Sequence, residues 1–237
     1  MHIRAIAAVS ILYFSLPVLA LAEKTHEHGG QIFHAIRLET DVGISGDGPL
    51  ANWDLDGWLG SDYTKLWLKS EGGSSDGHTP EKAEYWAMYS RNIATFWDAQ
   101  AGLRYDDKPA SITYLTVGFN GIAPYFFETE AHIFISDDGG ITARLRQEND
   151  FLITQKLITQ PYAEVHFSAQ DVSEQQIGVG ITSGELGIQT RYEVTRKFAP
   201  YIDLRYERKF GETSAIAKKD GKNSDDAVVS VGLRLMF

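Results

Sequence analysis

The chain has 237 residues, no cysteine and a formal net charge of −10. This length allows one domain, the lack of cysteine excludes disulfides and thiolate metal sites, and the acidic balance argues against a nucleic-acid partner, which would require a basic surface. The first element pairs a positive start at Arg4 with an apolar stretch to Leu19 and small residues at Ala20 and Ala22. It predicts a signal peptide over 1–22, cleaved after Ala22, rather than a membrane anchor, because the apolar run is short for a span.

The mature chain is predicted to consist of a short polar tail over 23–30 and a β-barrel over 31–237. Polar side chains alternate with apolar or aromatic ones along the barrel sequence, and this period of two indicates strands. Each segment has about the ~9–11 residues that a tilted strand needs to cross a bilayer. We count about twelve such segments, near 31–45, 50–60, 62–71, 82–91, 95–105, 110–120, 124–136, 140–150, 159–168, 184–194, 199–210 and 225–237.

The connections between these segments differ in length. Tight connections follow segments two, four, six and ten, whereas polar, glycine-rich ones follow segments three, nine and eleven, at 72–81, 169–183 and 211–224. Short periplasmic turns and long outer loops are typical of outer-membrane barrels. Aromatic residues near segment ends predict interfacial girdles, with these members: Tyr63, Tyr85, Tyr89, Trp97, Tyr105, Tyr125, Tyr192, Tyr201 and Tyr206.

The fold prediction is therefore all-β: a transmembrane antiparallel up-and-down β-barrel of about twelve strands, surrounded by outer-membrane lipid of a Gram-negative cell. The terminal Phe237 resembles the C-terminal signal of bacterial outer-membrane proteins. A soluble lipocalin-like barrel is the alternative, because alternation alone fits both.

If the polar parity faces inward, the lumen contains many charges of both signs. We expect a network of ion pairs that plugs the barrel rather than a charged pore, because unpaired buried charges are costly and about twelve strands enclose little space. The predicted network comprises Asp54, Asp56, Lys69, Glu84, Asp98, Arg104, Arg144, Arg146, Glu164, Arg191, Glu193, Arg205, Glu207 and Arg234.

Imidazoles close to carboxylates form two candidate sites for a divalent metal ion. The alternatives are a disordered polar leader for the first group and a satisfied ion-pair network for the second. The candidates are His26, His28 and His34 near the N-terminus, and Glu128, Glu130 and His132 on one strand face. His166 and Ser168 resemble the pair in outer-membrane phospholipase A, but their surroundings do not, so no enzyme activity is predicted.

From about Leu50 to Phe237 the chain resembles the copper resistance protein B family. The resemblance is carried by many motifs in order, including 53–58 (WDLDGW), 66–72 (LWLKSEG), 89–91 (YSR), 96–106 (FWDAQAGLRYD), 121–128 (GIAPYFFE), 154–157 (TQKL), 185–188 (ELGI), 191–193 (RYE), 198–201 (FAPY) and 207–211 (ERKFG).

The resemblance implies an outer-membrane protein of copper tolerance, with copper ions bound or sequestered. Family members usually carry a tail rich in Met and His before the barrel, whereas residues 23–30 contain His26 and His28 but no Met. This tail therefore lacks thioethers for Cu(I) and retains imidazole and carboxylate ligands that suit Cu(II). Two alternatives stay open: a narrow conduit for copper or small solutes, and a structural barrel that partners a periplasmic multicopper oxidase or copper carrier.

Overall fold

The strands form one closed antiparallel barrel. The computed structural model describes residues 31–237, with gaps at 75–79, 173–175, 220 and 222. Its strands are β1 (Phe33–Ser45), β2 (Gly48–Gly60), β3 (Thr64–Ser74), β4 (Lys82–Ala94), β5 (Trp97–Lys108), β6 (Ile112–Ala123), β7 (Phe127–Ser136), β8 (Ile141–Glu148), β9 (Phe151–Leu152), β10 (Leu157–Ser168), β11 (Gly180–Tyr192), β12 (Phe198–Lys209) and β13 (Asp225–Met236).

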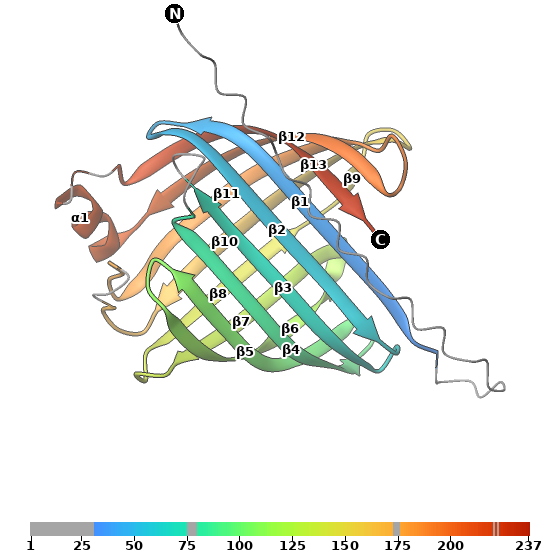
Figure 1. Cartoon of the computed structure of the whole chain (residues 1–237), viewed down its shortest axis with the longest axis horizontal. Coiled ribbons are helices and arrows are strands. Elements are labelled where there is room, and N and C mark those ends of the chain that lie inside the picture. The colour runs from blue at the N-terminus through green and yellow to red at the C-terminus, as the bar shows by residue number, and fades with distance from the viewer. Residues whose placement is uncertain (1–30, 75–79, 173–175, 220, 222) are drawn as a thin grey trace, which may run out of the picture.

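Each strand pairs with the next one along the chain, except that β8 pairs with β10, and β1 closes the barrel by pairing with β13 (Figure 1). The two-residue β9 continues the line of β8, since both pair with β10. The barrel therefore has twelve strand positions, and every segment predicted from the sequence occupies one of them. This confirms the predicted transmembrane antiparallel barrel. The predicted signal peptide and tail lie outside the described residues.

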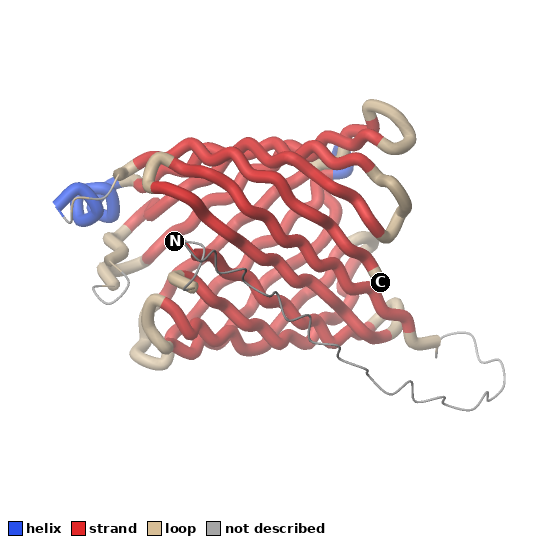
Figure 2. Tube along the Cα trace, turned by 45° about the horizontal axis from the view of Figure 1, so that its top comes forward, coloured by secondary structure: helices blue, strands red, loops and turns tan. Residues whose placement is uncertain are grey.

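Strand connections differ between the two ends of the barrel. The end that carries the C-terminus has short turns throughout, including a 3-10 turn η1 (Pro124–Phe126) between β6 and β7. The opposite end carries the long connections after β3, β10 and β12, seen at the left of Figure 2. The asymmetry is less regular than the sequence suggested, because three connections at the long-loop end are also short. In outer-membrane barrels the short turns lie at the periplasmic end.

The predicted loop over 211–224 contains a helix, α1 (Gly211–Lys219), that the period-two pattern could not reveal. Alanine and lysine favour helix locally, and Glu212 near its start and lysines at its end complement the helix dipole. The Thr213 hydroxyl accepts a hydrogen bond from the backbone N–H of Gly178, at 2.9 Å, which ties α1 to the loop between β10 and β11. Within the described part of the chain, no helix has the length and apolarity needed to cross a membrane.

The two faces of the barrel wall follow the alternation in the sequence. Outward positions carry exposed apolar side chains such as Leu103, Leu115 and Leu186, which form a surface suited to lipid. Inward positions carry most of the buried polar and charged side chains. One girdle prediction is wrong: Tyr201 is 5% exposed and faces the lumen, where its hydroxyl donates to Asp41. Tyr201 lies near the start of β12 but shares the inward parity of Asp203.

Candidate functional site: the charged lumen

The inward face is not uniformly polar. Inward positions of β4, β6 and β7 include an apolar cluster that was not predicted from the sequence. Its buried members are Trp86, Met88, Ile112, Tyr114 and Phe134. Trp86 and Phe134 pack edge to face with their ring centroids 5.0 Å apart. The alternation in the sequence does indicate these inward positions, because Trp86 and Met88 share the parity of Glu84, and Phe134 shares that of His132.

Two arginines lie over this aromatic wall. The guanidinium carbon of Arg104 is 4.6 Å from the ring centroid of Phe134 and 5.0 Å from that of Tyr114. The corresponding carbon of Arg144 is 5.3 Å from the centroid of Trp86. A planar guanidinium can stack on aromatic rings while its edges still donate hydrogen bonds, which suits arginine better than lysine for this position.

Glu84 joins these two arginines. Its carboxylate accepts hydrogen bonds from Arg144 Nη2 at 2.9 and 3.0 Å, and Arg104 Nη2 is 3.0 Å away. Arg104 also holds Asp106 through two bonds of 2.6 and 2.7 Å. Arg144 donates in addition to Glu71 on β3. These contacts join β8 to β3 and β4, which are four or five strand positions away, so they cross the lumen.

A second cluster surrounds Lys69 on β3. Its ammonium lies 3.0 Å from Asp56 on the neighbouring β2 and 2.5 Å from Glu130 on β7. The Trp67 indole N–H also donates to Asp56, at 2.8 Å. Glu130 therefore has its charge neutralised from the far wall, and this cluster forms a second link across the lumen.

A third cluster joins β1, β8 and β13 around Glu39. Arg234 Nε lies 2.6 Å from Glu39, and the Gln189 amide donates to the same carboxylate at 2.9 Å. Arg37 reaches Glu148 at 3.7 Å, next to the contact between Arg146 and Glu148 described below. Arg37 and Glu39 were not among the predicted network residues, although both share the inward parity of Asp41.

The other predicted network residues do not reach across the lumen but pair along one strand or with strands one or two positions away. Arg146 lies 3.1 Å from Glu148 and 3.3 Å from Glu164. Asp98 pairs with Lys65 at 2.5 Å, and Arg205 pairs with Glu207 at 2.8 Å. Arg191 pairs with Asp150 and lies 3.8 Å from Glu193. Asp54 lines a small cavity between these clusters. The structure thus places the predicted charged residues in the lumen or at its rim, in several linked clusters.

Glycines make room for tyrosines in the lumen. The Tyr162 ring covers Gly187 on the paired strand β11, where an added Cβ would lie 2.2 Å from Tyr162 Cζ. The Tyr162 hydroxyl then reaches Asp203, at 3.1 Å. Tyr201 covers Gly232 in the same way, with 2.3 Å to its Cζ. Only a residue without Cβ permits these close approaches.

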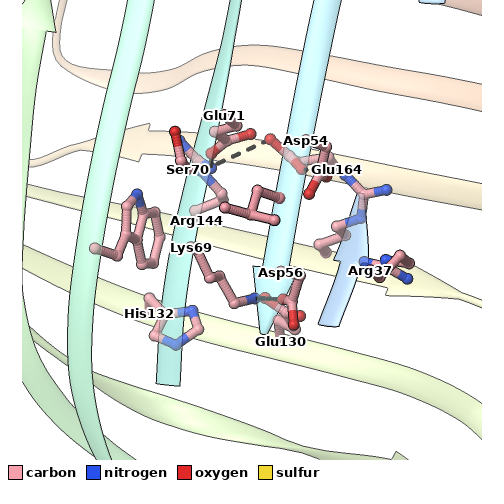
Figure 3. Close-up of a pocket in the computed structure, with 13 residues that line it drawn as sticks. Arg37, Asp54, Asp56, Lys69, Ser70, Glu71, Glu130, His132, Arg144 and Glu164 are labelled. Carbon is pink, nitrogen blue, oxygen red and sulfur yellow. Dashed lines mark hydrogen bonds and ion pairs between the residues drawn. The ribbon is translucent and has the colours of Figure 1, made fainter. Parts of the chain in front are cut away.

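Little open space is left where these clusters meet. A cavity of about 40 Å³ is lined by charged side chains from both walls, among them Arg37, Asp54, Lys69 and Arg144 (Figure 3). At ~10–15 Å³ per water, this volume holds roughly three water molecules. At this level the lumen is filled by side chains rather than open as a channel.

The predicted barrel metal ligands are engaged elsewhere. Glu130 binds Lys69, and His132 Nε2 lies 2.8 Å from the side-chain oxygen of Gln100. Within the described ranges, no three His, Asp or Glu side chains are grouped closely enough to hold a metal ion, so Glu128, Glu130 and His132 are not brought together as a metal site. His34 is exposed at the start of β1.

The remaining candidates contribute no such grouping either. His26 and His28 lie outside the described residues. His166 Nε2 lies 2.7 Å from Glu164, whereas the Ser168 hydroxyl donates to the backbone oxygen of Gln170. The histidine and the serine thus have separate partners.

The lumen and the barrel can be compared with known proteins. The sequence model of the family described as copper resistance protein B precursor (CopB) matches residues 32–237. Copper resistance protein B of Escherichia coli is 42% identical over 187 residues, which cover 78% of this chain and 63% of that protein. A homolog from Pseudomonas syringae pv. tomato is 39% identical over 192 residues, covering 81% and 65%. The chain thus spans slightly less than two thirds of the length of these relatives.

Solved structures share the barrel but little sequence. The NanC porin superposes with a TM-score of 0.57 at 11% identity, covering 84% of this chain and 98% of that one. A KdgM porin in complex with disordered oligogalacturonate gives a TM-score of 0.50 at 10% identity, covering 85% and 99%. At such identities the likeness concerns the fold alone, which is that of outer-membrane barrels.

Proposed function

The chain belongs to the copper resistance protein B family, and from this premise we propose that it acts in copper resistance by binding copper ions at the outer membrane. The family match and the two relatives support the copper role. The observation that favours retention of copper over free passage is the filled lumen, where ion pairs cross between opposite walls. An open porin would require a continuous aqueous lumen.

The charged lumen does not fit a copper ion as it stands. Carboxylates such as Glu84 and Glu130 are paired with arginine or lysine, and the buried histidine, His132, is held by Gln100. We therefore assign copper binding to His26 and His28, whose imidazoles and neighbouring carboxylates suit Cu(II). The residues themselves carry this assignment, together with the family's copper role.

Copper titration of the refolded chain in detergent tests the proposal. The chain starting at Glu23 is compared with a variant starting at Gly30 and with the double substitution His26→Ala, His28→Ala, while His34→Ala serves as a matched control on β1. We expect stoichiometric Cu(II) binding that is lost in the first two variants and kept in the control. Equal binding by all four proteins would move the site into the barrel, and no binding by any of them would contradict the proposal.

A further inference from the structure

Arg144 links opposite walls of the lumen through several ion pairs. Its guanidinium, anchored on β8, donates to Glu71 on β3 and to Glu84 on β4, and its Nε lies 3.7 Å from Glu164 on β10. One side chain thus connects the wall of β8 and β10 with the opposite wall of β3 and β4. The Arg144 side chain is 9% exposed, so these contacts are shielded from bulk water.

The surroundings hold Arg144 in this position. The ring of Trp86 lies on one side, 5.3 Å from the guanidinium carbon, and that of Phe134 lies 5.9 Å away. Three carboxylates and two aromatic faces hold the guanidinium in this position, because in any other position its charge would lose its partners in a poorly hydrated interior. The small cavity described above borders Arg144 directly.

Beyond Arg144 a row of carboxylates crosses the lumen wall, in which Glu164 pairs with Arg146 and Glu207 with Arg205. Glu164 on β10 is in register with Glu185 on β11, Glu185 with Glu207 on β12, and Glu207 with Asp226 on β13. Four carboxylates therefore follow one another across four strands. Within the described part of the chain, Glu185 forms no ion pair. A row of carboxylates along a lumen attracts cations and repels anions.

From this arrangement we propose that the Arg144 side chain closes a cation pathway through the barrel. With Arg144 in place, its ion pairs and the aromatic wall fill the lumen. Without it, the space of one guanidinium joins the adjoining cavity, and Glu71, Glu84 and Glu164 each lose one cationic neighbour, so the net charge of the lumen becomes more negative. The opened lumen would then conduct small monovalent cations such as potassium in preference to chloride. This inference concerns ion passage and does not depend on whether the chain binds copper.

Single-channel recording in planar lipid bilayers tests the proposal, with potassium chloride as the probe. The wild-type protein is compared with Arg144→Ala and with the control Arg208→Ala, which removes an arginine at an exposed position near the outer end of β12. We expect low conductance for the wild type and the control. We expect a clear rise for Arg144→Ala, and in a salt gradient a reversal potential shifted towards that of potassium.

Loss of Arg144 removes a buried cation from beside three carboxylates, so folding must be checked independently. The shift in gel mobility between unheated and heated samples reports the folded barrel. The double variant Arg144→Gln, Glu84→Gln removes both charges of one contact, keeps the side chains polar, and is expected to fold and conduct. The proposal is overturned if folded variants conduct no more than the wild type, if the wild type already conducts as well as they do, or if the opened barrel prefers chloride.

Discussion

Glu84→Gln is expected to destabilise the barrel by about 3 kcal/mol. Glu84 is 3% exposed and accepts from Arg144 and Arg104 at about 3 Å. Removing one partner of a buried ion pair costs ~3–5 kcal/mol because the other charge is left uncompensated. The lower end applies here, since Arg144 keeps Glu71 and Arg104 keeps Asp106.

Urea unfolding of the refolded barrel, followed by tryptophan fluorescence, measures this effect. With a denaturant slope of about 2 kcal/mol/M, the midpoint should fall by roughly 1.5 M. Glu207→Gln is the matched control: its side chain is 47% exposed and its near partner is Arg205, at 2.8 Å, so a loss below about 1 kcal/mol is expected. If both variants unfold at the same midpoint, the lumen is far better hydrated than the contacts indicate, and the reasoning fails.

Three further outcomes are expected. Leu103→Arg places a charge on the lipid face in the middle of β5, and should cost about 2–4 kcal/mol in lipid vesicles; an unchanged midpoint would contradict the outward assignment. Gly187→Ala should displace the ring of Tyr162, and unchanged stability would show that the ring can shift freely. In the turn after β7, hydrogen bonds from the Ser136 hydroxyl and the backbone N–H of Gly140 hold the pKa of Asp138 below its ordinary value. Since this pKa is lowered on folding, the small stability it contributes is present at neutral pH and is lost as pH falls through the folded pKa; carboxyl NMR should show Ser136→Ala raising that pKa.

The strands and their faces could be predicted from the sequence. Side chains alternate across a strand whatever the rest of the fold does, so the period of two located all twelve strand positions. The same parity placed residues such as Asp56 and Arg234 inside the barrel before any contact was known. The prediction for Tyr201 was wrong because its inward parity was not followed. Trp86 and Phe134 also have inward parity but were not predicted in the lumen, because their neighbours on that face are polar.

The pairing of charges across the lumen was decided only by the tertiary structure. Lys69 meets Glu130 at a separation of 61 residues, and Arg144 meets Glu71 at 73. Such contacts depend on the tilt and stagger of the closed sheet, which set the height at which each side chain enters the lumen. The alternation states that a side chain points inward, but it carries no information about the opposite wall. The sequence by itself therefore determined a charged barrel interior, whereas closure of the sheet decided which of these charges pair with one another.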